Sequence, residues 1–299
     1  MKERIRSLCR EKHAVVLAHY YARDEVQAVA DFVGDSLALA QYAAKTDAEV
    51  LVVCGVDFMA ETCKILCPDR KVLVPVKGAA CSLADSCRAE DLGKFMESHP
   101  GYKVVSYVNT TAEVKALSYV CVTSGNAMKV INSFPADEKL LFCPDKNLGG
   151  YINRLTGRDM LLWDGGCHVH ARFSADGVRK LKSRYADAIV LAHPECREEV
   201  LQEADFAGST AKMLEYVNSS QATTFIVATE PGIFFQLRTE HPDKRFISAQ
   251  EISADCQGMK LSTLEGIYEC LTTEKPEIIV DNELAHKAAI PIKRMLELS

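Results

Sequence analysis

The chain has 299 residues, and its 48% hydrophobic and 25% charged content is that of an ordinary globular protein, which excludes disordered, collagen-like and fibrous chains. Its 35 basic and 41 acidic residues leave a net charge of −6, which disfavours nucleic acid as a partner. No apolar run approaches the roughly 18 residues of a membrane span, and the N-terminus has no recognisable signal peptide. We therefore expect a cytoplasmic protein without membrane attachment, and the length predicts about two domains at roughly 150 residues each.

Apolar runs with the character of strands recur along the chain at matched spacings. His19, Tyr107 and His193 lie at the ends of three such runs; 88 residues separate the first from the second, and 86 separate the second from the third. Four rows of runs align in this register: 15–21, 104–109 and 189–195; 30–36, 118–124 and 204–210; 50–54, 140–143 and 224–228; and 71–76, 160–163 and 245–248. This internal repeat replaces the two expected domains with three units of about 87 residues each.

Helical patterns fill the spaces between the runs, as at 25–30 and 36–45. Residue types that begin helices precede or open such segments at Asp35, Ser36, Ser124, Ser209 and Thr210. Short strands that alternate with helices predict βαβ units and a parallel sheet.

The predicted architecture is an α/β fold of three similar three-layer units with small parallel sheets, arranged around a pseudo-threefold axis. We expect the first unit to span 1–83, the second 84–171 and the third 172–271. Helices within 272–299, with segments at 284–289 and 292–298, are expected to join the first unit.

One cysteine follows the fourth run of each unit, at Cys81, Cys167 and Cys256, whereas the other nine of the twelve cysteines show no threefold register. Ligands bind beyond the carboxyl ends of parallel strands, so three copies around an axis would bring these thiols to one point. Three converging thiolates predict a metal site, either zinc completed by histidine or water or a [4Fe–4S] cluster with one open iron. The alternative is that they are buried structural thiols, because cysteine is among the most buried residue types.

A ring of polar residues occupies the same strand-end register: His19, Tyr21, Ser36, Tyr107, Asn109, Ser124, His193, Glu195 and Thr210. Three of them, Ser36, Ser124 and Thr210, stand where helices begin, where free backbone N–H groups favour a small polyanion, although they could serve only as helix caps. The histidines and Glu195 are acid–base candidates, and the tyrosines could donate or relay protons. His170, close to Cys167, could bond a ligand. No glycine-rich fingerprint of a nucleotide site follows a first strand.

Several of these segments together resemble the quinolinate synthase family over essentially the whole chain. The most specific segments are 17–21, 30–36, 55–61, 107–110, 143–149, 166–170, 193–196 and 208–210. The resemblance implies three α/β units around a central cavity. It also implies a [4Fe–4S] cluster on Cys81, Cys167 and Cys256 with one iron open.

The resemblance further implies an enzyme of NAD biosynthesis that condenses iminoaspartate with dihydroxyacetone phosphate and releases quinolinate, phosphate and two waters. Iminoaspartate would come from an aspartate-oxidising enzyme. The substrate pocket would be lined by His19, Ser36, Tyr107, Asn109, Ser124, His170, His193, Glu195, Ser209 and Thr210. Proton transfers would involve Tyr21, Glu195, His193 and Tyr107, with Glu195 as the acid–base partner of Tyr21, while Ser209 would help to hold an anionic group.

The chain departs from the family pattern at Tyr20, where relatives often have asparagine, and at His168, where they often have proline. The side chains of two consecutive residues rarely reach two adjacent irons of one cluster. We therefore expect that His168 does not join Cys167 as a ligand. Two other functions fit the same residues: another [4Fe–4S] hydro-lyase acting on a different acid, and a non-catalytic protein that binds a small polyanion and has buried structural thiols.

Overall fold

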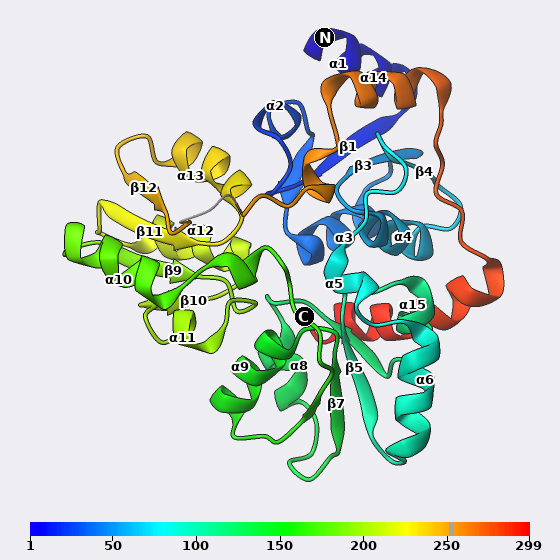
Figure 1. Cartoon of the computed structure of the whole chain (residues 1–299). Coiled ribbons are helices and arrows are strands. Elements are labelled where there is room, and N and C mark those ends of the chain that lie inside the picture. The colour runs from blue at the N-terminus through cyan, green and yellow to red at the C-terminus, as the bar shows by residue number, and fades with distance from the viewer. Residues whose placement is uncertain (251–253) are drawn as a thin grey trace.

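Three four-stranded sheets, all of parallel strands, form three lobes that meet at the centre of the molecule (Figure 1). The computed structural model describes residues 1–250 and 254–299. Each sheet takes its four strands from one predicted unit and has them in the same order, which is β2-β1-β3-β4 in the first unit. The predicted α/β fold with three similar parallel-sheet units is therefore confirmed.

The three units share one order of elements, in which each strand but the last is followed by a helix. The first unit consists of β1 (Ala14–His19), α2 (Asp24–Gln27), β2 (Phe32–Gly34), α3 (Ser36–Lys45), β3 (Val50–Cys54), α4 (Asp57–Leu66) and β4 (Lys71–Leu73). The second consists of β5 (Lys103–Tyr107), α7 (Ala112–Ala116), β6 (Val120–Val122), α8 (Ala127–Asn132), β7 (Leu140–Cys143), α9 (Lys146–Thr156) and β8 (Leu161–Leu162). The third consists of β9 (Ile189–Ala192), α11 (Glu198–Leu201), β10 (Phe206–Ala207), α12 (Thr210–Ser219), β11 (Thr224–Ala228), the 3₁₀ turn η2 (Pro231–Ile233), α13 (Phe234–Glu240) and β12 (Arg245–Ser248).

The remaining elements connect the units or lie at the termini. They are α1 (Lys2–Glu11), α5 (Ser82–Asp85), α6 (Ala89–Ser98), η1 (His170–Arg172), α10 (Ala175–Arg184), η3 (Gly258–Lys260), α14 (Leu264–Thr273) and α15 (Asn282–Glu297). None of the helices within the described residues combines the length and the apolar character needed to cross a bilayer.

Both faces of the first sheet are buried, as its continuous apolar strands predict. Successive residues of a strand point to opposite faces, so neighbours in β1 belong to different cores. Leu17 packs in the core that includes α3 and α4, whereas Val16 and Ala18 pack on the other face with Ile5 of α1 and Ile267 of α14. The first unit therefore has the predicted three layers.

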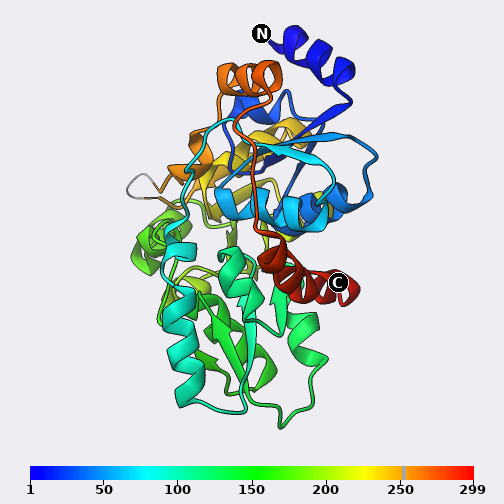
Figure 2. The same cartoon turned by 90° about the vertical axis from the view of Figure 1, so that its right-hand side faces the viewer.

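The packing of α14 differs from the expected unit boundaries. Residues up to 271 were expected in the third unit, but Ile267 and Leu271 fill the first core beside Ile5 and Cys9, and α1 and α14 lie side by side (Figure 1). The two helical segments expected after 283 form the single helix α15, which lies between the first and second lobes (Figure 2) and contacts α4, α7 and β6. Thus α14 completes a core of the first unit, whereas α15 packs between the first and second units.

We expect that Phe142→Ala in β7 destabilises the fold by about 3–5 kcal/mol, because it leaves a cavity in a close-packed core. Phe142 is fully buried at the centre of the second sheet. Leu155→Ala is the matched control, because this side chain is 53% exposed. Chemical denaturation followed by circular dichroism measures both, and equal losses of stability would contradict the packing described for β7.

Candidate functional site

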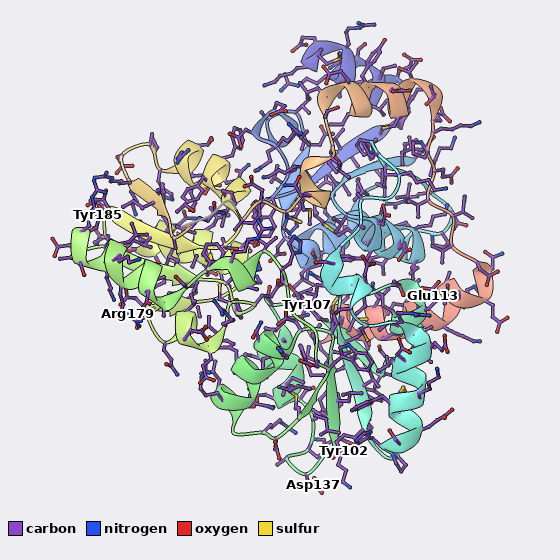
Figure 3. All side chains as sticks on the ribbon, in the orientation of Figure 1. Tyr102, Tyr107, Glu113, Asp137, Arg179 and Tyr185 are labelled. Carbon is purple, nitrogen blue, oxygen red and sulfur yellow. The ribbon has the colours of Figure 1, made fainter. Side chains whose placement is uncertain are left out.

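A cavity lies where the three units meet. Figure 3 shows Tyr107 near this centre, whereas Tyr185 and Asp137 lie on outer parts of the lobes. The predicted site residues that line the cavity are His19, Tyr21, Ser36, Cys81, Tyr107, Asn109, Ser124, Cys167, His170, His193, Glu195, Thr210 and Cys256. They converge because the carboxyl ends of parallel strands are where such sheets place their ligand-binding loops: His19 and Tyr107 end β1 and β5, and His193 follows β9.

Ser209 is the predicted site residue that is absent from the cavity wall. It is the N-cap of α12, and its side chain accepts a hydrogen bond from the backbone N–H of Lys212. Asp35 caps α3 in the same way, with Ala38 as the donor. Ser36 and Thr210 are therefore the first helical residues behind these caps, and Ser124 lies in the turn before α8.

The three in-register cysteines are the partly exposed ones, whereas the other nine cysteines are buried. Each precedes a short helical turn, and the backbone N–H three residues further on, at Ala84, His170 or Met259, bonds to the sulfur. Burial raises the pKa of all three thiols, that of Cys81 to about 12, while these N–H groups lower it. The local backbone thus favours the thiolate form that a metal requires.

The loops that carry two of these cysteines approach other backbone closely. A Cβ atom on Gly258 would lie 2.4 Å from the carbonyl oxygen of Ala80, and one on Gly165 would lie 2.4 Å from that of Pro144. No real side chain tolerates such contacts. The small residues beside the cysteines therefore let the backbones of neighbouring loops touch each other, and the Gly258 contact brings the Cys256 loop against the Cys81 loop.

Two overlapping donor sets in the cavity could hold a metal, and they share Cys167. Among the described residues, ligand atoms that all lie within 4.8 Å of one another belong to Cys167, His170 and Glu195, and the three cysteines do not form such a group. All three cysteines line the cavity wall, so they could bind either a single zinc ion or a multinuclear centre in which each sulfur binds a different metal atom.

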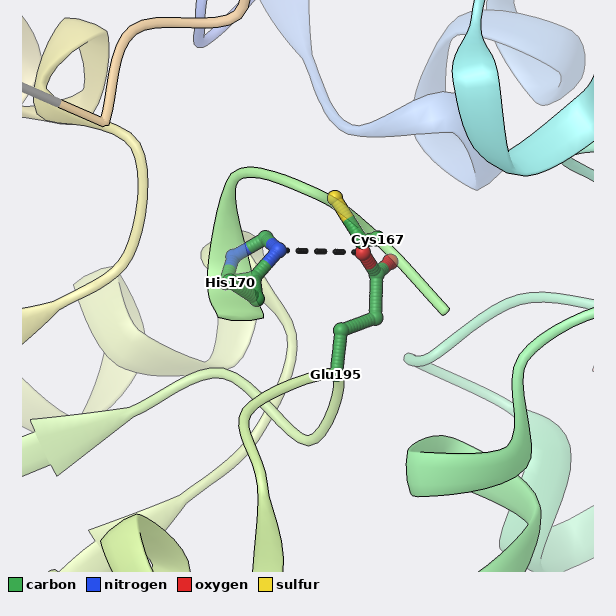
Figure 4. Close-up of side chains that lie close together, drawn as sticks. All are labelled: Cys167, His170 and Glu195. Atoms are coloured by element: carbon green, nitrogen blue, oxygen red, sulfur yellow. Dashed lines mark ion pairs between the residues drawn. The ribbon is translucent and has the colours of Figure 1, made fainter. Parts of the chain in front are cut away.

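A chain of polar contacts links the two tyrosines of the ring to Glu195. Tyr21 Oη and Thr229 Oγ1 lie 2.6 Å apart, and Thr229 Oγ1 lies 2.9 Å from His170 Nε2. His170 Nδ1 lies 3.0 Å from Glu195 Oε2 (Figure 4), and Glu195 Oε1 accepts a hydrogen bond from Tyr107 Oη at 2.6 Å. Tyr107, and not Tyr21, is thus the direct partner of Glu195, and Tyr21 reaches it through two intermediates.

The charges along this chain follow from burial and from these contacts. Burial raises the pKa of Tyr21 and of Tyr107 well above the ordinary value, and the nearby carboxylate raises both further. Burial also raises the pKa of Glu195, but His193, His170 and the Tyr107 hydrogen bond outweigh it, so the pKa of Glu195 is lowered. Glu195 is therefore an ionised carboxylate, and the phenol groups of Tyr21 and Tyr107 are protonated.

His19 and His193 occupy matched positions and have matched chemistry. Burial lowers the pKa of each imidazole to about 3, helped at His19 by the neighbouring His193, so both are neutral near pH 7. The Nδ1 atom of each accepts a backbone N–H from two residues on, from Tyr21 at 3.1 Å and from Glu195 at 3.3 Å. Because Nδ1 is an acceptor, the proton of the neutral ring lies on Nε2, which can donate to a bound molecule.

The predicted anion cradle brings together residues of all three units. A Cβ atom on Gly125 would lie 3.5 Å from Ser209 Oγ and 3.8 Å from Asp35 Oδ2. Among the described residues the cavity wall contains no lysine or arginine. Binding of an anion here would therefore depend on hydroxyl groups, imidazole N–H and the positive ends of α3 and α12.

His168 is absent from the cavity wall. Its Nδ1 atom lies 2.5 Å from Ser82 Oγ, and its side chain is exposed to solvent on that side. This placement is consistent with the prediction that His168 does not join Cys167 as a ligand, which stays a prediction.

The sequence reasoning missed three polar residues of the site: Thr229, Glu230 and Asp145. Thr229 and Glu230 directly follow β11, and Asp145 follows β7 by two residues. The strand-end rule that found His19 and Tyr107 on the first strand of each unit would have found them if it had also been applied to the third strands.

Three parallel sheets with a shared cavity of thiols, neutral imidazoles and an ionised carboxylate define an α/β enzyme with a central active site. The family model described as Quinolinate synthetase A protein matches residues 3–297. The chain is 48% identical to a quinolinate synthase of Microcystis aeruginosa over 299 residues, covering 99% of this chain and 94% of the relative. It is 47% identical to that of Chlorobaculum tepidum (99% and 93% covered) and 50% identical to that of Chloroherpeton thalassium (99% and 94%). The chain therefore belongs to the quinolinate synthase family.

Proposed function

We propose that this chain is a quinolinate synthase of NAD biosynthesis that condenses iminoaspartate with dihydroxyacetone phosphate to give quinolinate, phosphate and two waters. Its cofactor is a [4Fe–4S] cluster held by Cys81, Cys167 and Cys256, with one iron free of protein ligands. The observation that carries the proposal is that one thiol from each unit, and no other cysteine, reaches the wall of a single central cavity.

The donor set fits such a cluster. Three thiols, each with a backbone N–H directed at its sulfur, line one cavity wall, and no other cysteine of the described residues does. When bound, the cluster supplies a Lewis-acidic iron that favours departure of a hydroxyl group from the substrate. No fourth protein ligand is required, because a three-thiolate site leaves one iron for substrate.

The chain of contacts from Tyr21 to Glu195 moves protons during the two dehydrations. The Glu195 carboxylate only accepts, so a proton on His170 Nδ1, 3.0 Å from Glu195 Oε2, would face the carboxylate. Nε2 would then accept from Thr229, whose oxygen would accept from Tyr21. Return of a proton from Glu195 to Tyr21 requires the other neutral tautomer of His170, with the proton on Nε2. When Glu195 has taken a proton from a carbon of the substrate, it passes that proton to Nδ1, and Nε2–H donates through Thr229 to Tyr21, which replaces the proton that Tyr21 gave to a leaving oxygen. Tyr107 holds the carboxylate through its hydrogen bond, and His193 holds the substrate through its Nε2–H group.

The hydroxyl groups of Ser36, Ser124 and Thr210 hold the anionic groups of the substrates, and Ser209 supports Thr210 as the cap of its helix. His19 and Asn109 complete the pocket as neutral donors. We place the enzyme in the cytoplasm. An aspartate-oxidising enzyme in the same compartment would supply iminoaspartate, because this imine hydrolyses readily in water.

We expect Thr210→Val to raise the KM for dihydroxyacetone phosphate by about 10-fold or more with a smaller change in kcat, because a hydrogen bond to a charged group is lost. Thr210 is buried on the cavity wall at the first position of α12. Thr272→Val is the control, because this exposed residue of α14 bonds only along its own helix. Steady-state kinetics at saturating iminoaspartate measure both, and an unchanged KM in Thr210→Val would remove this residue from the cradle.

The proposed function is tested by anaerobic purification, followed by measurement of iron, sulfide and quinolinate production from the two substrates. A brown protein with four irons and four sulfides per chain that forms quinolinate is expected. A protein with the cluster but no quinolinate formation would favour another iron–sulfur hydro-lyase. A colourless protein without iron or sulfide would favour a non-catalytic polyanion-binding function.

A further inference from the structure

A second threefold set of side chains, all acidic, lies behind the three cysteines. Asp57, Asp145 and Glu230 follow β3, β7 and β11, the third strand of each unit, and 88 and 85 residues separate them in turn. Asp145 and Glu230 are fully buried, and Asp57 is partly buried. Each acidic residue therefore precedes the cysteine of its own unit, by 24, 22 and 26 residues in turn.

In the second and third units the carboxylate bonds directly to the backbone of the cysteine. Asp145 Oδ2 accepts a hydrogen bond from the N–H of Cys167 at 3.1 Å. Glu230 Oε1 accepts one from the N–H of Cys256 at 3.3 Å. These N–H groups lie in loops and have no strand beside them, so a side chain must satisfy them.

In the first unit the same contact falls two residues before the cysteine. Asp57 Oδ1 accepts a hydrogen bond from the N–H of Ala79 at 3.1 Å, and the N–H of Asp57 donates to the carbonyl oxygen of Ala79 at 2.9 Å. In the second unit the N–H of Lys146 donates to Gly165, also two residues before its cysteine, at 2.9 Å. In each unit, residues just after the third strand thus form hydrogen bonds with the backbone of the loop that carries the cysteine.

Each buried carboxylate serves several donors at once. Asp145 also accepts from the N–H of Leu148 at 2.8 Å. Glu230 also accepts from the N–H of Gly232 at 2.6 Å and lies 3.0 Å from Lys260 Nζ. A carboxylate has enough lone pairs for these contacts, whereas an amide of the same shape has an NH₂ group in place of one acceptor.

A negative charge beside a thiolate ligand is unfavourable, which argues that these groups are present for their geometry. A neutral acceptor would avoid this cost but would satisfy fewer donors.

Glu230 also connects the third unit to the first. Lys260 Nζ, 3.0 Å from Glu230, donates to the carbonyl oxygen of Tyr21 at 2.7 Å. The loop of Cys256 and the acid–base residue Tyr21 are therefore tied to one buried ion pair.

We propose that Asp57, Asp145 and Glu230 are positioning residues that set the spacing of the three cysteine loops and thereby retain the cluster. This inference rests on the proposed function, because it takes the three thiols as the ligands. Partners behind metal ligands commonly change metal retention or activity by about 10- to 100-fold when they are lost.

The test compares Asp145→Asn, Glu230→Gln and the partly exposed Asp57→Asn in the anaerobically purified holoenzyme. The control is Asp205→Asn, in which the lost carboxylate oxygen accepts a backbone N–H from Val190 at 2.8 Å, far from the cysteine loops. Release of iron to a chelator is followed by the visible absorbance of the cluster, and the melting temperature of each metal-free protein reports the fold. Asp57→Asn keeps the test decisive if a buried variant fails to fold.

We expect iron release about 10-fold faster or more in the three variants than in wild type, with metal-free melting temperatures like that of the control. If the folded variants release iron at the rate of Asp205→Asn, the positioning role is overturned but the proposed function is not. A wild-type protein that holds no iron and sulfide would overturn the proposed function and this inference with it.

Discussion

Replacement of Cys81, Cys167 or Cys256 by alanine is expected to remove the iron and sulfide from the anaerobically purified protein and to abolish quinolinate formation. The three thiols belong to different units and meet only at the central cavity, so none can be replaced by a neighbouring cysteine. The other nine cysteines are buried in the cores of the units. Iron and sulfide analysis with the visible spectrum measures the loss, and the melting temperature of the metal-free protein reports the fold.

The matched controls are Cys9→Ala and Cys270→Ala. Both thiols lie in the core formed by α1 and α14, far from the cavity. Neither sulfur lines the cavity wall, so neither can reach a metal bound there. Full iron content in these variants is expected. Loss of iron in Cys9→Ala at an unchanged melting temperature would contradict the ligand assignment.

Glu195→Gln is expected to lower kcat by about 10²- to 10⁴-fold with the cluster intact, the range for loss of a general acid–base group. The carboxylate is buried between His170 and Tyr107, and an amide would offer only one acceptor to these two donors. Tyr21→Phe, which removes the hydroxyl at the other end of the chain, is expected to fall in the same range. Single-turnover rates and iron content measured together separate loss of chemistry from loss of the cofactor.

Thr229 tests whether the two ends of this chain are coupled. Thr229→Val keeps the shape but removes the hydroxyl between Tyr21 and His170, and so it should reproduce part of the Tyr21→Phe defect. Thr229→Ser keeps the hydroxyl and is expected to retain most of the turnover. Full turnover in Thr229→Val would show that Tyr21 and Glu195 act separately.

Local patterns in the chain were enough to predict the repeat. Strand and helix periods are properties of neighbouring residues, so three copies of one βαβ pattern are visible without any tertiary contact. The predicted run 245–248 and the helix 36–45 have the same bounds as β12 and α3. Because parallel strands present their carboxyl ends at one edge, the same patterns also placed His19, Tyr107 and His193 on one cavity.

The identity of each side-chain partner needed the tertiary structure. Tyr21 was expected to pair with Glu195, yet its hydroxyl bonds to Thr229, and Tyr107 bonds to the carboxylate instead. Residues that are 88 or more positions apart become partners only through the relative orientation of whole units. No periodicity in the sequence records that orientation.

The sequence by itself therefore determined the three-unit α/β fold, the division of the cysteines into three and nine, and the set of strand-end residues, because all of these follow from local periods and their register. Only the tertiary structure decided that α14 completes the first core, that Thr229 joins Tyr21 to His170, and that Asp145 and Glu230 bond to the cysteine backbones. The Thr229 contacts depend on how the units pack against one another, whereas those of Asp145 and Glu230 depend on how loops fold back within one unit. In both cases a buried N–H or hydroxyl group is satisfied by a side chain distant in the sequence.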